Sequence, residues 1–306
     1  MVAFLYSWTI IKIKGGDIMN QQTALIADII QSRKSEERYD IQKKMILIID
    51  FLNKIYKDRL VKKVEISSGD SFQGLFDSPG TAFLYIRMMQ MLLYPIKIRA
   101  GIGVGTLDYM DKDFGTNLLD GEAYHNAKMA IDIISVTRKE AVYFNIKNSN
   151  HIFSNSVNTM LDMYYKLRQI FGVNSLRISL VNELLNPMSV NGEINYLDQT
   201  SDKEIEFLND IIKNSFIRRT GNNTVRMNAL SISQVKKAEP FTLDKYHINN
   251  RKNICGTSFV LRGIQDDVAN VIGTTRQNVQ KYYSRGVSDE RAYTASLVDL
   301  MNEVIK

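Results

Sequence analysis

The first half of the chain alternates between strand-like and helix-like segments, and this order constrains the fold most. Short apolar runs bounded by turn residues are typical of strands, and apolar residues three and four positions apart are typical of amphipathic helices. Strands are predicted at 23–28, 61–66, 71–76, 96–104 and 141–146, and helices at 35–57, 79–93 and 121–134. The resulting order, β-α-β-β-α-β-α-β, predicts one mixed sheet with helices packed against it.

Two aspartates fall where predicted strands end or turn. Asp28 closes the first apolar run, and Asp70 lies in the Ser-Ser-Gly-Asp turn between the second and third strands. If those strands are neighbours, both carboxylates emerge at the same end of the sheet. Such oxygen ligands suit Mg²⁺ or Mn²⁺, which in turn binds nucleotide phosphates. Taken singly, each aspartate is more simply explained as a residue that caps a strand end or a turn, because Asp is common in turns.

Four short motifs follow one another in a recognisable order: ADI at 27–29, SGDSFQG at 68–74, IRAGIGVG at 98–105 and GEAYHNA at 121–127. This series resembles the class III nucleotide cyclase fold, which is related to diguanylate cyclase and polymerase palms. It resembles more closely the SatD family, a cyclase-like bacterial family. The resemblance covers about residues 23–146, with weaker cover in the C-terminal third.

The resemblance implies a Mg²⁺ or Mn²⁺ cofactor, a purine nucleotide ligand and a homodimer. Asp28 and Asp70 match the two metal-binding aspartates of the cyclases. The turn that follows Asp28 could also direct backbone N–H groups and a hydroxyl toward a phosphate. The predicted metal ligands are Asp28, Asp70 and Ile29, and the predicted nucleotide contacts are Ile30, Ser32, Gly69, Gln73 and Arg99.

One motif departs from the cyclase pattern. In cyclases the helix after the glycine-rich strand carries an Asn and, four residues on, an Arg that stabilise the transition state. Here His125 takes the first position and Met129 the second. Met cannot offset charge that develops on a triphosphate, and Lys128 should point elsewhere on the helix. Ordinary cyclisation is therefore not expected. His125 and Lys128 are the candidate catalytic residues, and His125 could equally be a hydrogen-bonded core or groove residue.

The glycine-rich strand allows two interpretations. Three glycines within 101–105 could suggest a dinucleotide-binding loop, but no helix follows them directly and their spacing differs from that fingerprint. The favoured interpretation is that these glycines let another backbone pack closely on the strand. The chain contains no P-loop signature.

The C-terminal segment 265–281, QDDVANVIGTTRQNVQK, has the spacing of a helix-turn-helix. Ala269 would let the two helices approach, Gly273 would permit the turn, and Val279 would anchor the second helix. Thr274 or Thr275 can cap that helix. The side chains predicted to face double-stranded DNA are Thr275, Arg276, Gln277, Gln280, Lys281 and Arg285. The alternative is a unit used only for packing or protein contacts.

Composition adds limits on partners and compartment. The net charge of +6 suits an anionic partner. The single cysteine, Cys255, cannot form an internal disulfide, and three scattered histidines make no zinc cluster. A reducing, cytoplasmic location is therefore predicted, without membrane association.

The predicted fold class is α+β: a cyclase- or palm-like mixed sheet with packed helices, then a helical region and a helix-turn-helix domain. The apolar start of the chain is shorter than the about 20 residues that span a bilayer. Lys14 to Asp17 reads instead like an encoded ribosome-binding site before a natural start at Met19, so residues 1–18 are predicted to be an untranslated or disordered leader. The predicted parts are then 19–150 (palm), 151–250 (helical connection) and 251–306 (helix-turn-helix).

Three functions compete on this basis. The leading one is a nucleotide- and divalent-metal-binding regulator that binds DNA. The alternative is a metal-dependent nucleotide cyclase or nucleotidyltransferase whose C-terminal module provides dimerisation. The third is a palm that has lost metal and catalysis and serves as an interaction scaffold. The intact Asp28 and Asp70 argue against the third, and Met129 argues against the second.

Overall fold

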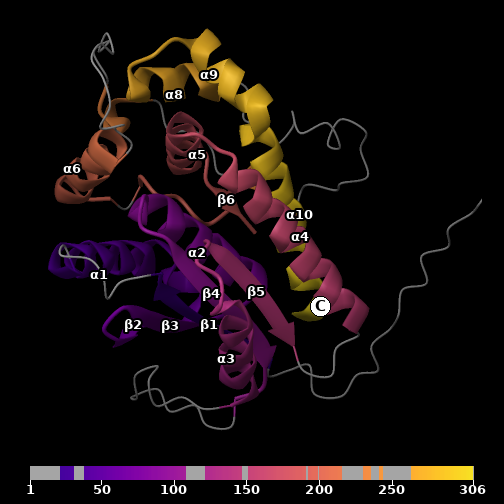
Figure 1. The fold of residues 1–306 in the computed structure, drawn as a ribbon. Helices are drawn as coiled ribbons and strands as arrows, with labels where there is room; N and C mark the ends of the chain where they lie inside the picture. Colours follow the sequence, from indigo (N-terminus) through magenta and orange to yellow (C-terminus); the bar gives the residue numbers. More distant parts are fainter. Residues whose placement is uncertain are drawn as a thin grey trace, which may run out of the picture.

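A computed structural model describes residues 21–30, 38–107, 121–146, 151–190, 192–198, 200–215, 230–235, 241–243 and 263–305 (Figure 1). The predicted leader and the predicted nucleotide contact Ser32 lie outside these residues.

Five strands form one mixed sheet in the order β2-β3-β1-β4-β5. They are β1 (Gln22–Ile29), β2 (Leu60–Ser68), β3 (Ser71–Phe76), β4 (Ile98–Gly105) and β5 (Ala141–Ile146). The central strand β1 runs antiparallel to β3 and β4, and β4 pairs with β5 in parallel. The predicted order of elements and the mixed sheet are confirmed.

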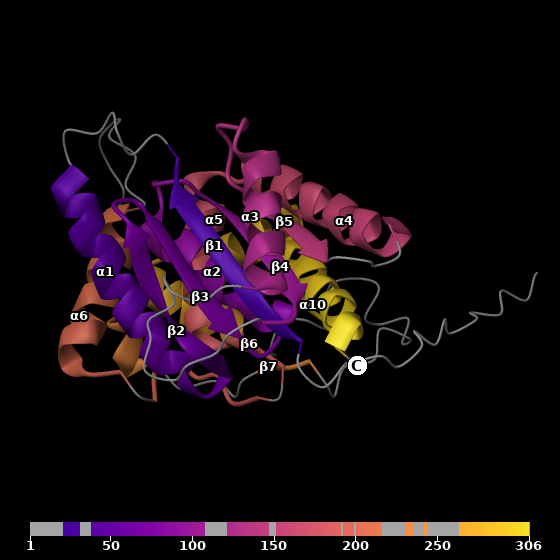
Figure 2. The same ribbon diagram turned by 90° about the horizontal axis from the view of Figure 1, so that it is seen from below.

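Helices cover the two faces of this sheet unequally. Alternate residues of β1 point to opposite faces, so that Leu25 and Ala27 join the main core with α1 (Arg38–Ile55) and α2 (Pro79–Leu93). Ala24 points the other way and packs against α3 (Glu122–Ile134). Figure 2 shows α3 on one side of the strands and α2 on the other. The whole of α2 is buried, and it begins at the Ser78 cap.

The glycines of β4 allow α3 to lie directly on the strand. A Cβ atom at Gly103 would come within 2.1 Å of the Ala127 nitrogen, and one at Gly101 within 2.2 Å of the Ala127 oxygen. Real Cβ atoms do not approach backbone this closely, so any other residue would force the helix away. The interpretation of these glycines as a close-packing surface is confirmed.

The rest of the described chain is mostly helical. Its elements are α4 (His151–Gln169), α5 (Val173–Leu185), β6 (Met188–Ser189), α6 (Asp202–Asp210), β7 (Phe241–Thr242), α8 (Ile264–Ile272), α9 (Arg276–Tyr282), η8 (Tyr283–Val287) and α10 (Ser288–Asn302). A capping box formed by Ser201 and Glu204 opens α6. The sequence pattern had not predicted α5.

The C-terminal helix α10 packs against α2 and α4, beside the sheet (Figure 1). The backbone N–H of Gly80 in α2 donates to Asn302 Oδ1 at the end of α10, at 2.9 Å. One apolar cluster includes Leu25 of the sheet, Leu180 of α5 and Val298 of α10. The described residues of the three predicted parts thus share a core. The boundaries near 150 and 250 stay predictions.

Candidate functional site

The two predicted metal-binding aspartates lie at the same end of the sheet. Strands β1 and β3 are neighbours, and the Ile29 N–H donates to the Asp70 carbonyl oxygen at 3.2 Å. The next N–H, of Ile30, donates to the Lys97 carbonyl at 2.9 Å, so it is used within the fold. The Gly69 carbonyl accepts a bond of 3.3 Å from Gln42 Nε2 of α1. The adjacency that the sequence predicts for Asp28 and Asp70 is therefore present.

Arg99 holds the carboxylate of Asp28 in a two-pronged ion pair. Its Nε lies 2.7 Å from Asp28 Oδ1 and its Nη2 lies 3.0 Å from Oδ2. The remaining nitrogen, Nη1, donates to the carbonyls of Ser135 and Thr137, just after α3. The pair is partly open to solvent, with 24% of the Asp28 side chain exposed. Arg99 thus contacts Asp28, where a nucleotide contact had been predicted.

Asp28 and Asp70 supply carboxylate oxygens, which are the kind of ligand that a hard cation prefers. A cation at Asp28 would have to compete with the Arg99 guanidinium, which already neutralises that carboxylate. Within the described ranges, no three His, Cys, Asp or Glu side chains lie close enough to hold a metal ion together. Metal binding at this sheet end stays a prediction.

Gln73 shares the face of the sheet with Asp28. Gln73 pairs with Ile26 of β1, and Ser71, two positions before it, pairs with Asp28. On the other edge of β3, Gln73 pairs with Glu65 of β2. Side chains two positions apart on a strand point the same way. Gln73 is therefore placed on the same surface as the ion pair, and its contact with a nucleotide stays a prediction.

Within one chain, the catalytic candidates on α3 do not lie beside Asp28. Helix α3 starts beside Gly105 and ends beside Arg99, so His125, in its first turn, lies toward the opposite end of the sheet from Asp28. His125 is exposed, and so is Met129, at 47% of its surface. Lys128 pairs with Asp132 at 2.9 Å on the outer surface. A catalytic role for His125 or Lys128 stays a prediction.

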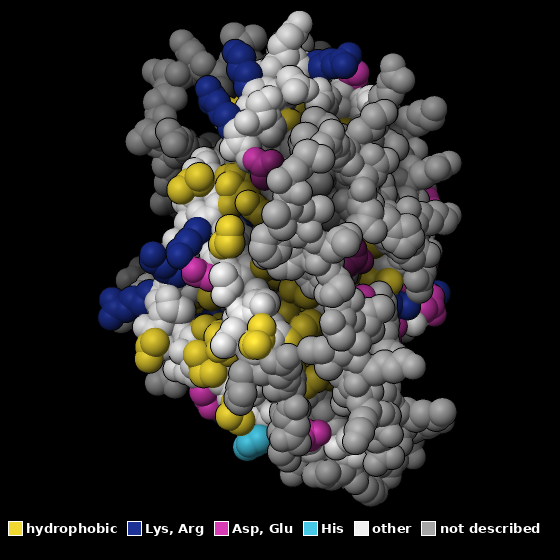
Figure 3. Space-filling model, turned by 90° about the vertical axis from the view of Figure 1, so that its right-hand side faces the viewer, with side chains coloured by type: hydrophobic (Ala, Val, Ile, Leu, Met, Phe, Trp, Pro, Cys, Tyr) yellow, Lys and Arg dark blue, Asp and Glu magenta, His cyan; other side chains and the backbone are white. Residues whose placement is uncertain are grey.

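Helices α8 and α9 meet at a tight turn whose details match the sequence pattern. Gly273 has a left-handed backbone (φ 74°), and the Thr275 hydroxyl caps α9 by accepting from the Asn278 N–H at 3.2 Å. Ala269 and Val279 are buried. All six side chains predicted to face DNA are exposed: Thr275, Arg276, Gln277, Gln280, Lys281 and Arg285. Lys and Arg side chains are visible at the upper end of the molecule, where α8 and α9 lie in Figure 1 (Figure 3).

Helix α5 connects this pair of helices to the rest of the fold. It packs against both α8 and α9. The buried Tyr283 hydroxyl donates to Asn182 Oδ1 at 2.6 Å, and Asn174 Nδ2 donates to the Tyr282 hydroxyl at 3.0 Å. The two helices are thus fixed to the body of the protein, and Tyr283 is part of its buried core.

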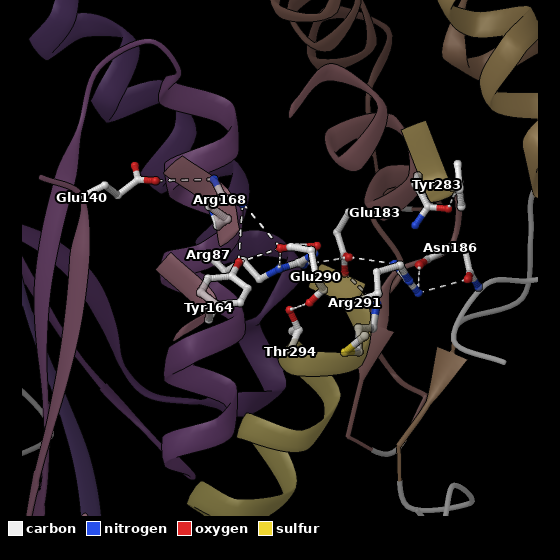
Figure 4. A network of polar contacts seen from close by, with 12 residues as sticks. Arg87, Glu140, Tyr164, Arg168, Glu183, Asn186, Tyr283, Glu290, Arg291 and Thr294 are labelled. Atoms are coloured by element: carbon white, nitrogen blue, oxygen red, sulfur yellow. Dashed lines mark hydrogen bonds and ion pairs between the residues drawn. The ribbon is translucent and has the colours of Figure 1, made fainter. Parts of the chain in front are cut away.

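A buried ionic network joins α2, α4, α5 and α10 (Figure 4). Arg87 bonds to both carboxylate oxygens of Glu290 at 2.9 and 2.8 Å, and it lies 2.7 Å from Glu183. Arg291 also reaches Glu183, at 2.9 Å. Arg168 lies 3.5 Å from Glu290 and from Glu140. The three arginines and three glutamates balance in charge.

Sequence reasoning did not identify this network, although one signal was available. Arg87 is the only charged residue in the segment 79–93, which is otherwise almost wholly apolar. A charge on a helix that is buried on all sides requires a buried partner. That partner, Glu290, lies 203 positions away along the chain.

Glu290 is held in its ionised form. Burial alone would raise the pKa of its carboxyl group, but the Arg87 guanidinium and its hydrogen bonds outweigh this effect and lower that pKa to about 2. Arg168 and a 2.7 Å bond from the Tyr164 hydroxyl act in the same direction.

None of the helices in the described ranges combines the length and the apolar composition needed to cross a lipid bilayer.

Comparisons with known proteins give a family match and several structural neighbours. No curated protein matches the chain. Among solved structures, a bacterial light-regulated adenylyl cyclase matches with a TM-score of 0.30 and 16% identity, over 41% of this chain and 75% of that one. The model of the SatD family matches residues 22–235, which is more than half of the sequence. The chain therefore belongs to the SatD family.

Proposed function

We propose that this SatD-family protein is a regulator that binds double-stranded DNA through α9 and a nucleotide with a divalent metal ion at the Asp28 end of the sheet. The observation that carries the DNA proposal is the division of α9 into two faces. Val279 is fully buried, while Arg276, Gln277, Gln280 and Lys281 are exposed together.

The exposed residue types suit a duplex. Glutamine and arginine side chains can hydrogen-bond base edges in the major groove, and lysine and arginine can neutralise phosphates. Arg276 lies 3.5 Å from Asp266, which is a long contact, and 64% of its side chain is exposed, so it can turn toward a ligand. The net charge of +6 favours association with a polyanion.

Replacing Lys281 and Arg285 together by alanine is expected to weaken binding to any duplex and to reduce its salt dependence. Each lost phosphate contact lowers the slope of log K against log salt by about 0.9, so the double variant should lose about 1.8. Fluorescence anisotropy with a labelled duplex over a range of KCl concentrations measures both quantities.

The matched control is the double variant Lys128→Ala, Lys166→Ala. It removes the same charge from exposed ion pairs on α3 and α4, away from α9. Equal weakening in both double variants, or a wild-type protein that does not bind duplex at low salt, would contradict a DNA-binding role for α9.

The metal and nucleotide part of the proposal is supported by the position of the two aspartates. Asp28 and Asp70 meet at one sheet end through the Ile29 N–H bond, and Arg99 stands beside them. A guanidinium binds phosphate oxygens as readily as a carboxylate. Arg99 could therefore pass from Asp28 to a phosphate when a metal ion takes the carboxylate. When bound, the metal ion would neutralise phosphate charge.

Wild-type protein is expected to retain Mn²⁺ together with one of the nucleoside triphosphates, and Asp28→Asn and Asp70→Asn should lose this retention. Electron paramagnetic resonance of Mn²⁺, with mass spectrometry of the nucleotide, reports binding and any product. Asp132→Asn, on the outer surface of α3, is the control. No cyclic product is expected, because Met129 cannot stabilise charge on the transferred group. Retention that survives Asp28→Asn would place the ligand elsewhere.

A further inference from the structure

We propose that the connection between α3 and β5, residues 135–140, transmits the state of the Asp28–Arg99 pair to α10 and so to α9. The inference rests on the proposed function, since it supplies the link between a sheet ligand and the DNA-facing helix. It is carried by a continuous series of contacts that begins at Arg99 and ends at the bend between α9 and α10.

The first contact in the series is made by Arg99 itself. One edge of its guanidinium binds both oxygens of Asp28, and Nη1 binds the carbonyls of Ser135 and Thr137. The same group therefore fixes a site residue and the start of the connection. A ligand that takes Asp28 or draws Arg99 to a phosphate changes the group that holds residues 135–137 in place.

The second contact is made at the far end of the connection. Glu140 immediately precedes β5, and its Oε2 lies 3.5 Å from Arg168 Nη2 on α4. Burial raises the pKa of Glu140 more than Arg168 lowers it. The ionised form of Glu140 is consequently stabilised less than that of Glu290, whose pKa is lowered.

Arg168 is the loosely bound member of the network. Its contacts to Glu140 and Glu290 are both 3.5 Å, whereas the contacts of Arg87 and Arg291 to their glutamates are between 2.7 and 2.9 Å. Among the residues that the structure describes, the buried Nε of Arg168 has no hydrogen-bond partner. Figure 4 shows Arg168 between Glu140 on one side and Glu290 on the other. A displacement of Glu140 can therefore shift Arg168 without breaking the shorter pairs.

The last contacts lie at the bend before α10. Glu290 is in the first turn of α10, and Gly286 in η8 has a φ of 119°, which interrupts the helical path from α9. A Cβ at Gly286 would lie 3.1 Å from Leu167 and 3.0 Å from Phe171. The bend thus rests beside Arg168 on the end of α4, so a shift at Arg168 acts on the angle between α9 and α10.

Hydrogen–deuterium exchange of the full chain tests this coupling without requiring a ligand. Arg99→Gln and Asp28→Asn are expected to speed amide exchange in residues 135–140 and also in 283–291, by about fivefold or more, the lower end of typical coupling between sites. Glu140→Gln should speed exchange in 283–291. The Arg99→Gln, Glu140→Gln double variant should exchange in this segment only slightly faster than Glu140→Gln alone.

Two further variants keep the test decisive. Lys128→Ala breaks an exposed ion pair on α3 and should leave 283–291 unchanged. If Arg99→Gln loosens the whole fold, Arg99→Lys keeps the charge but cannot make all four contacts, and it should still affect both segments.

Faster exchange in 135–140 with unchanged exchange in 283–291 would overturn the coupling. The DNA and Mn²⁺ assays are separate measurements, so their failure beside a positive exchange result would contradict only the proposed function.

Discussion

Replacing Glu290 by glutamine is expected to lower the free energy of unfolding by about 3–5 kcal/mol, the usual effect of removing one partner of a buried ion pair. Glu290 is fully buried and pairs with Arg87 and Arg168, and it accepts a bond from Tyr164. Glutamine keeps the shape of the side chain but leaves two buried guanidinium groups with one counter-charge fewer. Urea denaturation followed by circular dichroism measures the change.

Asp162→Asn is the control for this variant. It breaks the exposed ion pair with Lys166 on α4, an i,i+4 pair at 2.6 Å whose two side chains are more than half exposed. Exposed pairs of this kind contribute about 0.3–0.5 kcal/mol. Comparable losses in the two variants would show that the buried network does not hold α10 in place.

The same carboxylate gives the protein a defined response to acid. The pKa of Glu290 is about 2 in the folded chain, below its ordinary value of 4.5. A depressed pKa stabilises the fold fully above the unfolded value, and this stabilisation is lost as the pH falls from 4.5 toward 2. The free energy of unfolding of the wild-type protein should therefore fall through this window. Glu290→Gln should fall less, as repeated urea titrations between pH 2.5 and 6 would show.

Gly103→Ala is expected to lower the free energy of unfolding by about 3 kcal/mol or more, at the upper end of the overpacking range or beyond. The new methyl group would lie 2.1 Å from the Ala127 nitrogen and 2.4 Å from the Ala123 oxygen. Both atoms belong to the backbone of α3, so no side-chain rotation relieves the contact and the helix must move off β4. Thermal and urea unfolding both report the loss.

Gly172→Ala provides the comparison for this substitution. A Cβ at Gly172 would meet no atom of the described residues within 4 Å, and the φ of −75° is open to any residue. The melting temperature of this variant should stay close to that of the wild type. If Gly103→Ala melted at the same temperature as Gly172→Ala, α3 could not lie as close to the sheet as described.

Features set by short stretches of sequence could be predicted. The order of strands and helices from β1 to β5 follows from hydrophobic periodicity within each segment. The cap at Thr275 and the capping box at Ser201 follow from a few adjacent residues. The close packing at Gly101 and Gly103 followed from the absence of side chains. In each case the determining interaction lies within the segment itself or follows from the size of one residue.

Helix α5 could not be predicted for a reason that lies in the tertiary structure. It buries polar residues, among them Ser179, Asn182 and Glu183, together with its leucines. The burial of Asn182 and of Glu183 is compensated by partners on other elements, Tyr283 and Arg291 respectively. Without those partners the segment lacks a clear apolar face, and periodicity gives no signal.

The state of the candidate site was likewise decided only by the tertiary structure. The sequence predicted that Asp28 and Asp70 share one sheet end, because adjacent strands place them there. It did not predict that Arg99, 71 positions away, occupies both oxygens of Asp28. The register of β1 on β4 sets that pair, and the packing of α10 on α2 sets the pair of Arg87 and Glu290. Local patterns do not encode register or helix packing, because both depend on surfaces that meet only when distant segments have folded together.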